Sequence, residues 1–172
     1  YVGNYAAEIG TLSDLFAVDV TDGYLAELEH AFPVDGPLVG KAPLADFDGD
    51  GLSNLFEYAY CHDPASGGSR PRFQPVPLAE GDDAFLGLTM TVRADPGLVF
   101  LARFGASLEA MSEVNLTFSG SAGWESSDPE LLRIVSAVDE GSGKWTLEIR
   151  EGTPLQKDVP RFLQPGVRTE AP

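Results

Sequence analysis

The spacing of apolar residues in the first part of the chain predicts short helices. A helix is expected between residues 21 and 32, with Thr21 or Asp22 as its cap and Pro33 after its end. Its apolar residues lie three to four positions apart and form one face: Tyr24, Leu25, Leu28 and Phe32. A second helix is expected at Ser53–Tyr60, before the Asp63-Pro64 stop.

From residue 84 onward the apolar positions alternate with polar ones, which is typical of strands with one buried face. Leu98–Phe104 is apolar on both faces and predicts a central strand, and Leu131–Val138 predicts another mostly buried one. Six short strands separated by turn residues favour an antiparallel β-sandwich. They are expected around Leu86–Val92, Leu98–Phe104, Val114–Phe118, Leu131–Val138, Trp145–Ile149 and Arg161–Leu163.

The spacing of apolar residues changes along the chain from three to four positions to two, and this change divides the chain into three parts. Residues 65–83 are rich in Pro, Gly and Ser and are predicted to be a linker. A helical segment, 1–64, precedes it, and the β-sandwich, 84–172, follows it. The predicted fold class is therefore mainly β with a small helical part.

Composition narrows the possible partners. The chain has 172 residues, 43% of them hydrophobic, which is enough for a folded core. Its net charge of -16 argues against nucleic acid and anionic membranes and suits divalent cations. No apolar run is long enough to span a membrane. A single cysteine, Cys61, excludes an intrachain disulfide and leaves the redox compartment open.

The twelve residues from Asp46 to Glu57 carry oxygen-bearing groups at the spacing of a calcium loop. Ca²⁺ takes six to eight oxygen ligands at roughly 2.3–2.6 Å, and Gly51 falls at position six, where the loop must turn sharply. The loop would use carboxylates, a backbone carbonyl at Leu52 and a water-mediated contact at Asn54. The predicted metal ligands are Asp46, Asp48, Asp50, Leu52, Asn54 and Glu57. The alternative is a solvated Asp-Gly turn without an ion.

The segment from Ala42 to Pro64 resembles the EF-hand-like calcium loops of dockerins and thrombospondin type 3 repeats. It is also similar to a loop near the C-terminus of many large secreted bacterial proteins, where a small β-sandwich ends the chain. This resemblance implies short helices flanking one calcium loop and a last strand near Arg161–Arg168. Gln164-Pro165-Gly166 departs from that strand and is expected to interrupt its pairing. A dockerin has two such loops and binds cohesin, whereas only one is intact here.

Trp124 is the candidate ligand-binding residue, because an exposed tryptophan in a Ser- and Gly-rich loop can stack on a sugar. The alternative is that it half-covers the sandwich core. Cys61 and His62 are neighbours whose side chains do not face each other on a helix, so they do not predict a catalytic pair. No sequence rule pairs the many carboxylates in space, and no active site is predicted.

These patterns together predict a secreted, non-catalytic, calcium-binding protein with a structural or interaction role. Calcium would stabilise the fold and an extracellular assembly with other copies or other proteins, to which the Tyr1–Tyr5 tail would add a strand. Millimolar extracellular calcium suits a single loop of modest affinity. The alternative is a carbohydrate-binding module of a secreted glycan-degrading enzyme, with Trp124 in its site.

Overall fold

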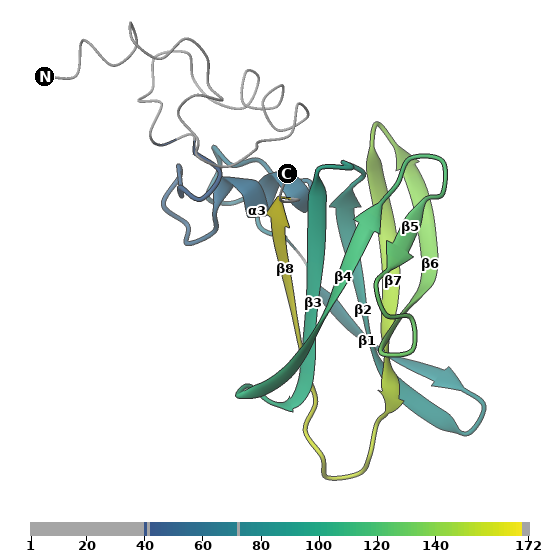
Figure 1. Ribbon diagram of the computed structural model, residues 1–172. Helices are drawn as coiled ribbons and strands as arrows, with labels where there is room; N and C mark the ends of the chain where they lie inside the picture. Colours follow the sequence, from purple (N-terminus) through teal and green to yellow (C-terminus); the bar gives the residue numbers. More distant parts are fainter. Residues whose placement is uncertain (1–39, 41, 72, 170–172) are drawn as a thin grey trace, which may run out of the picture.

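The computed structural model describes residues 40, 42–71 and 73–169. This part of the chain forms two antiparallel four-stranded sheets that face each other, with one short helix beside them (Figure 1). The prediction of a mainly β fold with a small helical part is confirmed. The elements are α3 (Asn54–Ala59), β1 (Gln74–Glu80), β2 (Asp83–Arg93), β3 (Leu98–Ser107), β4 (Ala110–Phe118), β5 (Trp124–Ser126), β6 (Leu132–Gly141), β7 (Lys144–Pro154) and β8 (Phe162–Thr169).

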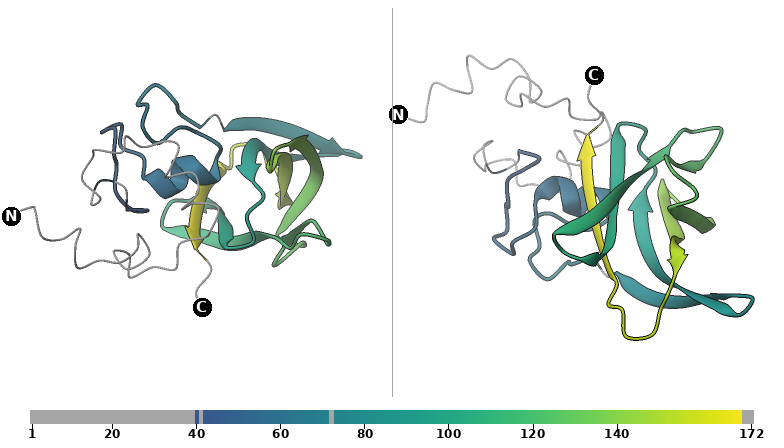
Figure 2. Two further views of the ribbon diagram at one scale, coloured as in Figure 1. Left: turned by 90° about the horizontal axis from the view of Figure 1, so that it is seen from above. Right: turned by 60° about the horizontal axis from the view of Figure 1, so that its bottom comes forward.

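The two sheets have the strand orders β1-β2-β7-β6 and β5-β4-β3-β8. Figure 2 shows them as two layers when the molecule is viewed from above. The alternating apolar residues point into the space between the layers, as their period requires. β3 lies between β4 and β8, so the prediction of a central strand at Leu98–Phe104 is confirmed. The buried side chains there include Leu88, Met90, Val92, Phe100, Phe104, Leu116, Leu147 and Ile149.

Strand β1 lies within the range predicted as linker. It pairs with β2 along its whole length, for example Leu78 with Phe85. Pro75 and Pro77 made this segment look unsuited to a sheet, because proline cannot donate to a ladder. β1 is an edge strand, where one side of the backbone needs no partner, so the two prolines are tolerated.

The prediction of a mostly buried strand at Leu131–Val138 is wrong. Strand β6 is exposed along most of its length, and Val135 and Val138 are about half exposed. β6 is the edge of its sheet and pairs with β7 alone. The periodicity shows that these residues are apolar, but not whether a neighbouring strand covers them.

The predicted interruption at Gln164-Pro165-Gly166 is also wrong. β8 pairs with β3 without a break, with Pro165 opposite Ala102 and Gly166 opposite Leu101. β8 is another edge strand, and an edge strand tolerates a proline whose nitrogen faces away from its partner.

Helix α3 packs into the sandwich core. Its end is anchored by two tyrosines: Tyr58 donates a hydrogen bond from Oη to Asp95 Oδ2 (2.9 Å), and Tyr60 donates one from Oη to the Gly166 carbonyl (3.0 Å). The helical segment and the sandwich therefore share one core. The residues that α3 and its C-cap contribute to it are Leu55, Tyr58, Ala59 and Tyr60.

The helix expected at residues 21–32 and the Tyr1–Tyr5 tail lie outside the described residues. Among the described residues, no helix combines the length and the apolar character needed to cross a membrane.

Candidate metal centre

Asp46 shapes the loop through hydrogen bonds to its backbone. Its Oδ1 accepts from the N–H groups of Gly49 (2.8 Å) and Asp50 (3.1 Å), and its Oδ2 accepts from the Gly51 N–H (2.8 Å). These bonds lower the pKa of Asp46, the one from Gly51 most of all. Gly51 has a φ of 93°, a conformation that favours glycine, so the sharp turn expected at position six is present.

Asp48 and Asp50 each use one carboxylate oxygen to hold the turn, and the loop backbone does not contact the other. Asp48 Oδ1 accepts from the Asp50 N–H (3.1 Å), and Asp50 Oδ1 accepts from the Leu52 N–H (2.9 Å). The Oδ2 atoms of both residues are buried. Asp48 Oδ2 has no hydrogen-bond partner among the described residues, whereas Asp50 Oδ2 is in an ion pair with Arg70, 3.0 Å from its Nε. Burial raises the pKa of Asp48. Asp48 can therefore still offer a carboxylate oxygen to a cation, and Asp50 would offer an oxygen that Arg70 also contacts.

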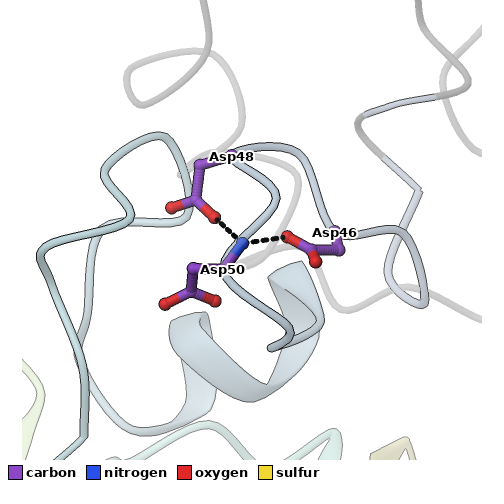
Figure 3. A group of neighbouring side chains, drawn as sticks. All are labelled: Asp46, Asp48 and Asp50. Carbon is purple, nitrogen blue, oxygen red and sulfur yellow. Dashed lines mark hydrogen bonds between the residues drawn. The ribbon is translucent and has the colours of Figure 1, made fainter.

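The three aspartates converge on one small volume. One carboxylate oxygen from each of Asp46, Asp48 and Asp50 lies within 4.8 Å of the other two. Figure 3 shows the carboxylates of Asp46 and Asp48 on either side of the Asp50 nitrogen, with a helix beneath the loop. One cation could therefore be shared by all three side chains.

Glu57 is the fourth carboxylate and lies in α3, directly after the loop. Ser53 begins this helix as its N-cap and accepts a hydrogen bond from the Phe56 N–H (3.3 Å). The Glu57 side chain is 0% exposed, and neither of its oxygens has a hydrogen-bond partner among the described residues. A buried carboxylate without a partner is costly, because the lost hydration is not replaced.

Most of the negative charge around Glu57 comes from the loop, with a further contribution from Asp63. The pKa of Glu57 is raised to about 8, first by burial and then by the negative charges of Asp48, Asp50 and Asp46. All three predicted aspartate ligands are therefore close enough to act on this carboxylate. A divalent cation among the four groups would reverse these repulsions and give the buried oxygens a partner.

The side chain of Asn54, predicted to contact the ion through a water, makes direct hydrogen bonds to the backbone before and at the start of the loop. Asn54 is fully buried; its Oδ1 accepts from the Phe47 N–H (3.1 Å), and its Nδ2 donates to the carbonyls of Gly40 and Ala42 (both 2.9 Å). These three bonds fix the entry of the chain into the loop. A water-mediated contact from Asn54 and the carbonyl contact from Leu52 remain predictions.

A segment after α3, here called the closing segment (residues 63–70), folds back over the loop. Ser69 Oγ accepts from the Asp63 N–H (3.0 Å), and a Cβ placed on Gly67 would lie 3.4 Å from the Asp50 Cβ. Arg70 Nε lies 3.0 Å from Asp50 Oδ2. Sequence reasoning missed this segment because the motif ends at Glu57. The one available signal was that Arg70 is the first lysine or arginine after the loop.

Trp124 lies at the edge of the core. Its ring is partly buried on β5, with its centroid 5.4 Å from that of Phe100 and 5.3 Å from that of Phe118. These contacts favour the alternative in which the tryptophan half-covers the sandwich core. Stacking on a sugar remains an untested prediction.

The Cys61–His62 pair lies just after α3. Cys61 has a φ of 60°, and His62 Nδ1 lies 3.1 Å from Ser69 Oγ in the closing segment. This contact joins His62 to the segment that covers the loop.

Comparisons of this chain with protein-family models, with curated proteins and with solved structures found no match.

Proposed function

We propose that this protein binds one calcium ion in the loop from Asp46 to Glu57 and uses the ion to stabilise its fold. The observation that carries the proposal is the fully buried, unpartnered Glu57 beside three convergent aspartates. The ligands would be carboxylate oxygens of Asp46, Asp48, Asp50 and Glu57 and the carbonyl of Leu52. The bound ion would supply positive charge to Glu57, which has no hydrogen-bond partner among the described residues, whereas Asp50 is already paired with Arg70.

The chemistry of the donors favours calcium over other common ions. All five proposed ligands are oxygens, which suit hard cations, whereas zinc prefers nitrogen and sulfur ligands. Magnesium needs a tight octahedron and usually keeps several waters, so a site with four carboxylates and a backbone carbonyl suits it less well. Calcium accepts a larger and less regular shell.

The position of Glu57 supports a structural rather than a catalytic role for the ion. Glu57 lies between Leu55 and Tyr58, which are both buried in the sandwich core. An ion that draws Glu57 toward the aspartates would hold α3, and with α3 the core residues next to it. Its binding free energy would then appear as folding stability.

We place this role outside the cell, where calcium is abundant enough for one loop of modest affinity. Interaction with other copies of the chain or with other extracellular proteins remains a prediction that none of the described contacts tests.

The experiment is thermal unfolding of the full chain in millimolar calcium, in millimolar magnesium and in excess chelator. A calcium concentration a hundredfold above the dissociation constant adds about 3 kcal/mol, or roughly 5 to 10 °C for a domain of this size. We expect Asp48→Asn to abolish the gain and magnesium to give a smaller one. Asp82→Asn, in the exposed β1–β2 turn, makes the same change of charge and should keep the full gain. A midpoint that is equal in calcium and chelator would refute the proposal.

A further inference from the structure

We propose that Arg70 sets the calcium affinity of the loop from outside the twelve-residue motif, as a tethered cation that competes with the ion. This inference rests on the proposed function. It concerns a positioning residue in the closing segment, thirteen positions after the last predicted ligand.

Arg70 and the proposed ion would share an acceptor. Arg70 Nε lies 3.0 Å from Asp50 Oδ2, the buried oxygen that the loop backbone leaves unused. The guanidinium also donates to the backbone carbonyl of Asp50. The Asp50 side chain is 4% exposed, so the arginine and the ion would share an oxygen that water reaches poorly.

The closing segment holds Arg70 in this place. The segment is tied to itself by hydrogen bonds from the Asp63 N–H to Ser69 Oγ (3.0 Å) and from the Ser69 N–H to the Ser66 carbonyl (2.7 Å). Gly67 at its tip lies against Asp48 and Asp50. Arg70 follows directly after Ser69, so its backbone is fixed beside the loop although its side chain is 61% exposed.

The charges determine the sign of the effect. A guanidinium next to a ligand oxygen stabilises Asp50 in the absence of calcium and repels the dication when it is bound. Because Arg70 is largely exposed, water and salt screen this repulsion, and the expected effect is about threefold to tenfold at low ionic strength. A residue that only supported the fold would have the opposite effect, because its removal would loosen the site.

The test is the rate of calcium release from the fully loaded full chain, measured by rapid mixing with a fluorescent chelator. This rate starts from the folded, loaded protein and does not depend on the stability of the calcium-free state. We expect R70Q to release calcium about threefold to tenfold more slowly than the wild type, and R70K, which keeps the charge, to stay within about twofold. The difference between R70Q and the wild type should shrink in high salt.

The matched control is R103Q. Arg103 is an exposed arginine paired with Glu113 (2.7 Å) on the sandwich, and its loss should leave the release rate unchanged. An R70Q rate equal to or faster than the wild-type rate would overturn the inference. If the wild type binds no calcium, both the proposed function and this inference fail, whereas normal binding with an unchanged R70Q rate rejects the role of Arg70 alone.

Discussion

Two glutamates are completely buried in the part of the chain that the structure describes, and their surroundings differ. Glu151 lies on β7 in the sandwich and forms a buried ion pair with Arg161, with Oε2 3.0 Å from Nε. Glu57 lies on α3 beside the acidic loop and has no hydrogen-bond partner among the described residues. Both side chains are 0% exposed. The sandwich provides a cation for Glu151, whereas Arg70, beside the loop, pairs with Asp50 and not with Glu57.

The contrast separates the two regions by how their stability arises. In the sandwich, the buried Glu151 is paired with Arg161 of the same chain. The core of the sandwich is built from alternating apolar residues. The loop gathers negative charge around a buried carboxylate, so its folded form gains from a cation in solution. The two regions are coupled, because Tyr58 and Tyr60 extend from the helix that carries Glu57 into the sandwich core.

The largest expected effect comes from breaking the pair in the sandwich. Glu151→Gln removes the counter-charge of Arg161, whose side chain is mostly buried, and should lower the free energy of unfolding by about 3–5 kcal/mol. The loss should be the same with calcium and with chelator, because both partners belong to the sandwich. Urea unfolding under the two conditions measures it.

The control for this change is Glu113→Gln. Its ion pair with Arg103 is exposed, and exposed pairs contribute less than about 1 kcal/mol. A Glu151→Gln protein as stable as Glu113→Gln would show that the buried pair of Glu151 with Arg161 contributes no more than an exposed pair. The contrast between Glu151 and Glu57 would then fail.

The second prediction concerns Glu57→Gln, which should not lower the free energy of unfolding in chelator but should lower it in calcium. Glu57→Gln replaces a buried carboxyl group, whose pKa of about 8 keeps it mostly protonated at pH 7 without calcium, by a neutral amide of the same volume. The protein in chelator should therefore be as stable as the wild type or more stable. In millimolar calcium it should lack the wild-type gain of about 3 kcal/mol. Glu140→Gln, an exposed change on β6, should keep that gain. A Glu57→Gln protein that responds to calcium like the wild type would remove Glu57 from the site.

The features that could be predicted from the sequence are local or periodic. The turn at Asp46–Gly51 and the helix at Ser53–Tyr60 follow from residues within one short stretch, and both are present. The sandwich follows from the alternation of apolar residues, which is present in β2, β4 and β7. In each case, the residues that determine the structure are close together in the chain.

The features that could not be predicted depend on contacts between distant residues. The prolines of β1 concealed a strand, because only the sheet order shows that β1 is an edge. The exposure of β6 has the same cause. Arg70 approaches Asp50 across twenty positions, and a motif defined by spacing does not extend that far. The Glu151–Arg161 pair likewise depends on how β7 and the segment before β8 meet.

For Asn54, the calcium-loop motif and the hydrogen bonds of the structure predict opposite effects of the same substitution. As a ligand at position nine, it would tolerate a carboxylate, and Asn54→Asp would bind calcium at least as tightly as the wild type. The hydrogen bonds predict the reverse. Aspartate can still accept from the Phe47 N–H, but it cannot donate to the carbonyls of Gly40 and Ala42.

We therefore expect Asn54→Asp to lose about 2 kcal/mol of stability even in saturating calcium, because two carbonyls would face a negative oxygen where they now receive hydrogen bonds. Urea unfolding in millimolar calcium measures this loss. Asn115→Asp, on strand β4, adds the same charge away from the loop and should change the stability by less than about 0.5 kcal/mol. Unchanged stability together with tighter calcium binding in Asn54→Asp would make Asn54 a ligand. The loss expected here would make it the residue that holds the loop entry, and the ion would then depend on the four carboxylates and the Leu52 carbonyl.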